Sequence, residues 1–104
     1  MEFVETRVFT ERIVQLLTDE AYQALQWVLA EHPKAGEVIP GAGGLRKWRW
    51  RAAGRGKRGG LRIIYYCWSA DRLYMLFVYD KTRQGDLTPE QLKVLRAYVT
   101  GGVL

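Results

Sequence analysis

The chain has 104 residues, of which 48% are hydrophobic and 26% charged, with a formal net charge of +5. This length and composition predict one folded domain whose core needs neither a metal nor a disulfide, and they exclude a disordered chain. No apolar run approaches the roughly 20 residues that span a bilayer. The acidic N-terminal segment also lacks the apolar core of a signal peptide, so we expect a cytoplasmic protein with no membrane partner. The single cysteine, Cys67, is expected to be a buried thiol.

The first part of the chain predicts one strand followed by two helices. Residues 2–8 alternate weakly and contain β-branched side chains, which predicts a strand. Thr10 can cap a short helix through Leu17. Thr18 precedes a longer helix, because acidic residues follow it at once and apolar residues then recur at helical spacing. This helix should end at His32, since a proline comes next.

The second part predicts three strands and a final helix. A glycine-rich turn at residues 40–44 comes first. Segments rich in aromatic and β-branched residues then predict antiparallel strands at residues 45–51, 61–68 and 72–79. The last two are joined by a turn short enough for a tight hairpin. Thr88 and Gln91 form a capping box, with Pro89 at the first helical position of the last helix.

This order of elements predicts a compact α+β fold with a mainly antiparallel sheet. We expect the N-terminal helices to pack on one face of the sheet, a C-terminal helix to follow, and the second face to be left free. Period two along residues 61–68 puts Arg62 and Ile64 on the side nearer the free face. Along residues 45–51 cations interleave with tryptophans, some of which must belong to the core.

Positive charge is concentrated in one segment. Eight of the sixteen Lys and Arg residues lie between Arg46 and Arg62, and no acidic residue occurs between Glu37 and Asp71. The other eight basic residues face eleven acidic ones, which leaves a net charge of −3 on the rest of the chain. A cationic segment on a mildly acidic body favours polyanion binding, and nucleic acid is the commonest such partner.

Glycines and cations alternate in "GRGKRGG" at residues 54–60. Missing side chains let a backbone approach a ligand and offer its amides to phosphate. The composition of this segment fits equally a solvated hairpin loop and a surface shaped for phosphate.

Four stretches together, "IPGAGGLRKWRW", "GRGKRGGLRIIYY", "LFVYDK" and "DLT", resemble the RelE-like toxins of bacterial type II toxin–antitoxin modules, and within them the HigB-type branch. The resemblance covers nearly the whole chain, from the "EAYQALQ" segment to the last helix. It implies a single RelE-like toxin domain at residues 1–104 that inhibits translation by cutting mRNA in the ribosomal A site. It also implies an antitoxin partner, a small helix-turn-helix DNA-binding protein, through which alone the toxin would reach operator DNA.

RNA can be cleaved by its own 2′-hydroxyl, which attacks the adjacent phosphorus and expels the 5′-oxygen. A catalyst must align these groups, move protons and stabilise the charge that accumulates on the phosphoryl oxygens. The only histidine, His32, lies at an expected helix end, where a structural role is favoured over catalysis. The catalytic work then falls on lysine and arginine.

Arg62 is the first candidate, because a guanidinium on a strand can grip phosphate through two parallel hydrogen bonds. The alternative is a surface arginine without a partner. The resemblance implies further catalytic cations at Arg55 and Lys57 in the glycine-rich loop and at Lys81 after the last strand. A plain surface ion pair between Asp80 and Lys81 also remains open.

Five other cations are expected to contact the RNA or rRNA backbone: Arg46, Lys47, Arg49, Arg51 and Arg58. The four that lie on the expected strand at residues 45–51 are also compatible with solvated strand residues. The general base is unassigned, with Tyr65, Tyr66 and Lys57 as open alternatives. Some RelE-like enzymes use a C-terminal tyrosine as the proton carrier, whereas Tyr98 is here expected to face the core or the antitoxin.

Two functions from other classes stay open. One is a non-catalytic inhibitor, as in the related ParE branch that poisons DNA gyrase, and the other is a corepressor that helps its antitoxin grip operator DNA. The clustered cations favour the nuclease, because a gyrase inhibitor does not need cations that converge on one phosphate. One cysteine, one histidine and scattered acids give no metal-ligand spacing, and "GAGG" is not a dinucleotide motif, so we expect neither a metal nor another cofactor.

Overall fold

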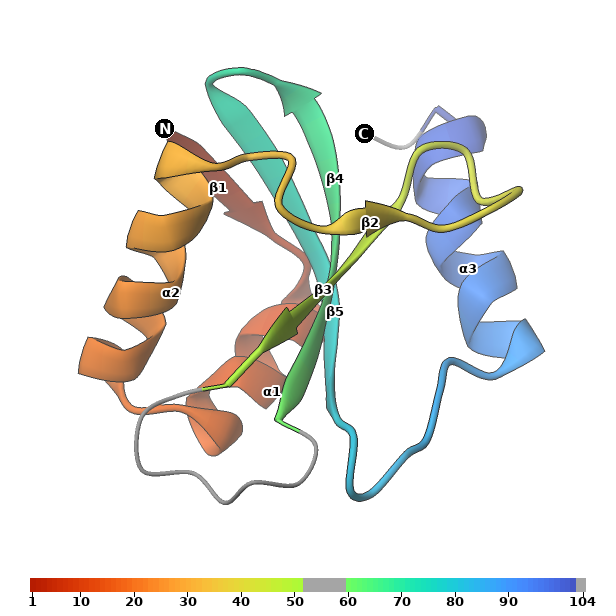
Figure 1. The fold of residues 1–104 in the computed structure, drawn as a ribbon. Helices are drawn as coiled ribbons and strands as arrows, with labels where there is room; N and C mark the ends of the chain where they lie inside the picture. Colours follow the sequence, from red (N-terminus) through yellow and green to blue (C-terminus); the bar gives the residue numbers. More distant parts are fainter. Residues whose placement is uncertain (52–59, 103–104) are drawn as a thin grey trace.

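The computed structural model describes residues 1–51 and 60–102, and Figure 1 shows a central sheet with helices on both sides. The elements in chain order are β1 (Glu2–Glu5), α1 (Arg7–Leu16), α2 (Asp19–Glu31), β2 (Glu37–Val38), β3 (Arg46–Trp50), β4 (Leu61–Ser69), β5 (Arg72–Asp80) and α3 (Pro89–Thr100). The predicted α+β class is confirmed. No helix within these residues combines the length and apolar character that a bilayer crossing requires.

The five strands form one mixed sheet in the order β1-β5-β4-β3-β2. The three predicted strands pair antiparallel with one another, and the short turn between β4 and β5 closes a hairpin as expected. β1 runs parallel to β5, and the two-residue β2 pairs antiparallel with β3. β2 was not predicted, because both of its residues are exposed and carry no hydrophobic alternation.

The N-terminal prediction is wrong in one respect. The expected strand at residues 2–8 ends before Thr6, and Thr6 rather than Thr10 caps α1 by accepting a hydrogen bond from the Phe9 amide at 3.1 Å. The helix begins there because Phe9 and Ile13, four residues apart, then lie on one buried face. Thr10 lies inside the helix.

The other two helices begin and end where the sequence predicts. Thr18 caps α2, and His32 is its C-terminal cap. At α3 both hydrogen bonds of the capping box between Thr88 and Gln91 are present, and Gly101 caps the other end.

The first core lies between the sheet and the two N-terminal helices. Phe9 and Ile13 of α1 and Leu25 and Leu29 of α2 pack against inward-facing residues of β4 and β5. As expected, tryptophans belong to it: Trp48 and Trp50 pack against the same cluster. Cys67 packs there too, but it is half-buried rather than buried.

A second core covers the opposite face of the sheet, so the expectation of a free face is wrong. Leu95 of α3 packs there with Ile64 of β4 and with Leu76 and Phe77 of β5. Figure 1 shows α3 on the side of the sheet opposite α1 and α2. The apolar stripe of α3 must be buried, and the first face is already occupied. Tyr98 packs against this second core, as expected for a core residue.

α1 also closes the edge of β5 beyond its pairing with β1. The Thr6 hydroxyl donates to the Leu76 carbonyl at 2.7 Å, and Arg12 Nη1 donates to the Val78 carbonyl at 3.2 Å. An open strand edge exposes unpaired backbone groups, and these side chains satisfy two of them. Arg12 is thereby held beside the C-terminal end of β5.

Candidate nucleic-acid interface

Arg62 lies at the start of β4, in the interior of the sheet. Its register partners are Arg49 on β3 and Tyr79 on β5. It is the one buried charged side chain among the described residues, with 8% of its surface exposed. Its Nη1 donates to the Leu61 carbonyl at 3.4 Å. Because so little of its surface is exposed, Arg62 is not the surface arginine of the alternative interpretation. Burial of a guanidinium is costly for stability.

Two cations of β3 share a hollow with Arg62. Lys47 and Arg49 lie opposite Ile64 and Arg62, which puts both on the face that α3 covers in part, as period two predicts. The hollow has a volume of about 380 Å³, and Lys47, Arg49 and Arg62 line it together with a single carboxylate, Glu37. Three positive charges against one negative charge make it attractive to an anion.

A tyrosine and an aspartate join this group from β5 and from the segment before α3. Tyr79 Oη donates to Asp86 Oδ1 at 3.5 Å, and Lys47 Nζ approaches the same oxygen at 3.4 Å. The Leu87 amide also donates to that oxygen, at 2.8 Å. Asp86 thus holds a lysine of β3 and a hydroxyl of β5 at one point.

These contacts set the protonation states of the pair. The Leu87 amide, with Lys47 and Lys81 nearby, lowers the pKa of Asp86 despite some loss of hydration. Burial raises the pKa of Tyr79 to about 12, the Asp86 carboxylate adds to the rise, and the charge of Arg62 opposes it. At neutral pH Asp86 is ionised and Tyr79 keeps its proton, so Tyr79 is a hydrogen-bond donor.

The raised pKa of Tyr79 predicts that the free energy of unfolding depends on pH. The folded state favours the protonated phenol, so this contribution to stability is complete below the ordinary pKa of 10.0 and is lost as the pH rises through about 12. In urea titrations over this interval, the unfolding free energy of the native chain should fall more steeply than that of Tyr79→Phe. Identical slopes in the two proteins would show that Tyr79 ionises normally.

Lys81 lies directly after β5. Its amide donates to the Gly60 carbonyl at 3.1 Å, and its ammonium donates to the Gly85 carbonyl. Its charge contributes to the lowered pKa of Asp86, so it lies near the Asp86 group. Asp80 accepts from the amide and hydroxyl of Thr82.

The other two described cations predicted to contact RNA, Arg46 and Arg51, do not line this hollow. Arg46 donates to the carbonyls of Gly36 at 2.7 Å and Lys34 at 3.4 Å, which braces the turn before β2. Arg51 is exposed and follows β3. Arg55, Lys57 and Arg58 lie outside the described residues.

Gly60 shows how closely β3 and β4 approach at this end of the sheet. Its φ is +86°, and a Cβ placed there would lie 2.7 Å from the Trp50 carbonyl oxygen. Only glycine combines this backbone angle with this approach. It brings the start of β4, and with it Arg62, against the end of β3.

Two of the residues considered as proton carriers have structural contacts. Tyr65 is buried on the α2 side, accepts from the Gly36 amide at 2.9 Å and donates to the Pro33 carbonyl at 2.8 Å. Burial raises its pKa, so it is a poor base. His32 caps α2 and lines a different hollow, with Cys67. Tyr66 packs against the second core, on the face of Arg62.

Sequence reasoning did not assign Tyr79 and Asp86. Both lie in the stretches "LFVYDK" and "DLT" that carry the family resemblance, which was the signal that could have identified them. Comparison of the chain with models of known protein families gives no match. Among the described residues no cluster of histidine, cysteine and acidic side chains could hold a metal ion.

Proposed function

We propose that this chain is the toxin of a type II toxin–antitoxin module, a RelE-like protein of the HigB type that cuts mRNA in the ribosomal A site. The observation that carries the proposal is the buried Arg62, which shares a hollow with Lys47 and Arg49. The hydrogen-bonded pair of Tyr79 and Asp86 adjoins these cations. Cations that converge on one concave face suit a phosphodiester.

The chemistry is an in-line transfer within the RNA itself. The 2′-oxygen loses its proton and forms a bond to phosphorus while the bond from phosphorus to the 5′-oxygen breaks. The leaving 5′-oxygen takes up a proton, so the products are a 2′,3′-cyclic phosphate and a 5′-hydroxyl, and no water is consumed in this step. Arg62 stabilises the negative charge on the non-bridging oxygens, and Lys47, Lys81 and the Tyr79 hydroxyl supply further donors nearby.

Proton transfer is the step for which these residues are least suited. Tyr79, with a pKa of about 12, and Asp86, with a lowered pKa, are both poor bases at neutral pH. An enzyme with this inventory depends on the ribosome to hold the mRNA in line for attack. Naked RNA is therefore cut far more slowly than mRNA on the ribosome.

Two macromolecular partners follow from the proposal. The first is the ribosome with its mRNA. Arg49 on β3 and Arg51 directly after it are exposed and available to rRNA or mRNA phosphates. The second partner is the helix-turn-helix antitoxin, which neutralises the toxin and alone contacts operator DNA.

Primer extension on an mRNA bound to programmed ribosomes tests the proposal. We expect breaks inside the A-site codon with the wild-type chain and none with buffer alone. Equal cutting of naked RNA would contradict the ribosome requirement. Intact mRNA together with arrested DNA replication would instead identify a gyrase inhibitor, and intact mRNA without growth arrest would identify a corepressor.

A further inference from the structure

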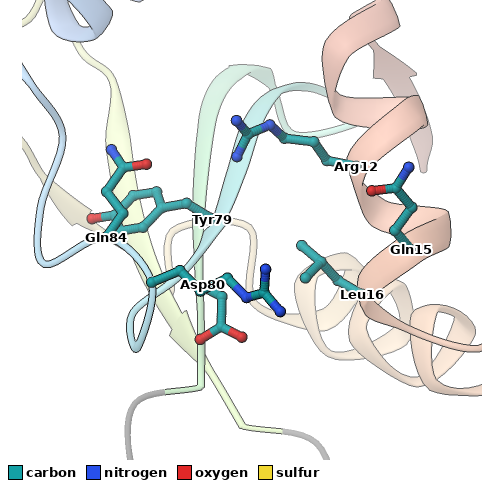
Figure 2. A pocket seen from close by; sticks show the side chains of 7 residues that line it. Arg12, Gln15, Leu16, Tyr79, Asp80 and Gln84 are labelled. Carbon is teal, nitrogen blue, oxygen red and sulfur yellow. The ribbon is translucent and has the colours of Figure 1, made fainter.

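A second hollow shares Tyr79 with the candidate site. This hollow, the α1 pocket, has a volume of about 590 Å³. It is lined by Arg12, Gln15 and Leu16 of α1, by the end of β5, and by Arg83 and Gln84 of the following turn. Figure 2 shows the α1 side chains facing Tyr79 and Gln84 across it. Its volume falls in the range of roughly 300–1,000 Å³ that is typical of small-molecule sites.

Arg12 is fixed at this pocket by two contacts. Its guanidinium carbon lies 4.5 Å from the centre of the Phe77 ring, and its Nη1 donates to the Val78 carbonyl at 3.2 Å. A guanidinium stacked on one ring in this way has a second face on which another flat group can stack. Nucleobases stack on arginine in this manner in RNA complexes.

The opposite wall of the pocket supplies both hydrogen-bond donors and hydrogen-bond acceptors. Gln84 Nε2 donates to the Asp86 carbonyl at 2.9 Å and to Gln91 Oε1, which leaves Gln84 Oε1 as the acceptor of this amide. Arg83 adds a second guanidinium to the lining. The two guanidinium groups outnumber the one carboxylate of the pocket, Asp80, and Asp80 already accepts from Thr82.

This combination matches a nucleotide better than a simple anion. A nucleotide offers a flat base, whose edge carries donors and acceptors, and a negatively charged phosphate. The α1 pocket offers a stacking cation, an apolar wall at Leu16, an amide acceptor and a second cation. A free phosphate would use only the cations.

We infer that the α1 pocket binds the base and phosphate of the nucleotide next to the RNA linkage that Arg62 grips. The inference rests on the proposed function and adds a second nucleotide subsite to it. Tyr79 belongs to both places, since its hydroxyl joins the Asp86 group and its side chain lines the pocket. Asp86 in turn contacts Lys47 of the cationic hollow, so Tyr79 and Asp86 connect the two hollows.

The test uses fluorescein-labelled RNA hexanucleotides whose central linkage is blocked by a 2′-deoxy sugar. One series keeps all bases, and two others each lack one base beside the blocked linkage. Fluorescence anisotropy at low salt should show about tenfold weaker binding for one of the abasic RNAs to the full chain. With Arg12→Gln, intact and abasic RNA should bind alike, because the stacking partner is gone.

Two further variants keep this test interpretable. Arg7→Gln on the same helix is the matched control, since the Arg7 side chain is 94% exposed, and it should retain the tenfold difference. If Arg12→Gln does not fold, Arg83→Gln in the exposed turn replaces it. It should weaken binding of the intact hexanucleotide but not of an RNA shortened to end at the blocked linkage.

The outcomes separate this inference from the proposed function, because binding is measured without ribosomes and without cleavage. Equal binding of intact and abasic RNA to the wild type would overturn the subsite even if A-site cutting is observed. The subsite would also be overturned if removal of the base weakened RNA binding equally in the wild type and in Arg12→Gln. Adenosine or guanosine monophosphate binding as tightly as the hexanucleotide would overturn an RNA subsite in favour of a mononucleotide site.

Discussion

Arg62→Ala should abolish the growth arrest that the wild-type chain causes and should reduce A-site cutting by at least about a hundredfold. The guanidinium is held in the interior of the sheet, and no other described cation on this face is buried to the same degree. Loss of a fixed donor to the phosphoryl oxygens removes stabilisation that exists mainly in the transition state. Arg62→Lys should recover only part of the activity, because an ammonium cannot form two parallel bonds to phosphate.

The matched control for this variant is Arg72→Gln on β5. Arg72 is a half-buried strand arginine paired with Glu2 at 2.6 Å, and its loss should leave growth arrest unchanged. Circular dichroism and antitoxin binding must be normal for both variants. Growth arrest by Arg62→Ala at the wild-type level would remove the basis of the proposed site. From the sequence alone, Lys57→Ala carries the same expectation as Arg62→Ala.

Leu95→Ala should lower the free energy of unfolding by about 2–5 kcal/mol. Leu95 is 4% exposed and packs in the second core, so its truncation opens a cavity between α3 and the sheet. The neighbouring Val94 is 60% exposed, and Val94→Ala should change stability by no more than about 0.5 kcal/mol. Urea unfolding followed by circular dichroism measures both. Equal effects would contradict the burial of α3 on the sheet.

The helix ends were largely predictable, because capping is a local property. Thr18 and Thr88 both cap where the sequence indicates. The error at α1 is informative, since Thr6 and Thr10 are both able to cap a helix. Tertiary packing decides between them, because only a start at Thr6 puts Phe9 in the buried face. A burial partner distant in the sequence cannot be read from local pattern.

The coverage of the second sheet face could not be predicted for the same reason. Leu92, Leu95 and Val99 recur at helical spacing along α3, but such an apolar stripe does not specify which sheet face it covers. That choice depends on the first face being filled by residues of α1 and α2, such as Phe9 and Leu29. The parallel pairing of β1 with β5 is likewise set by a partner about seventy residues away.

The sequence indicates only parts of the candidate site. Alternation predicts that Lys47 and Arg49 share one side of β3, but it does not say which side of β3 faces the same way as Arg62 of β4, and the pairing of Arg49 with Arg62 decides that. Tyr79 and Asp86 were not assigned, because a tyrosine in an apolar strand and an aspartate before a helix both have ordinary structural roles. Their meeting at 3.5 Å depends on the path of the turn between β5 and α3.

The most direct test of the central claim replaces one sugar of the mRNA. Ribosomes are programmed with an mRNA that carries a single 2′-deoxyribose at the linkage cut by the wild-type chain, and an unmodified mRNA serves as the reference. We expect the unmodified mRNA to be cut and to leave a 2′,3′-cyclic phosphate, whereas the modified linkage should stay intact. Cutting of the deoxy linkage at the reference rate would contradict attack by the 2′-hydroxyl and, with it, the role proposed for Arg62.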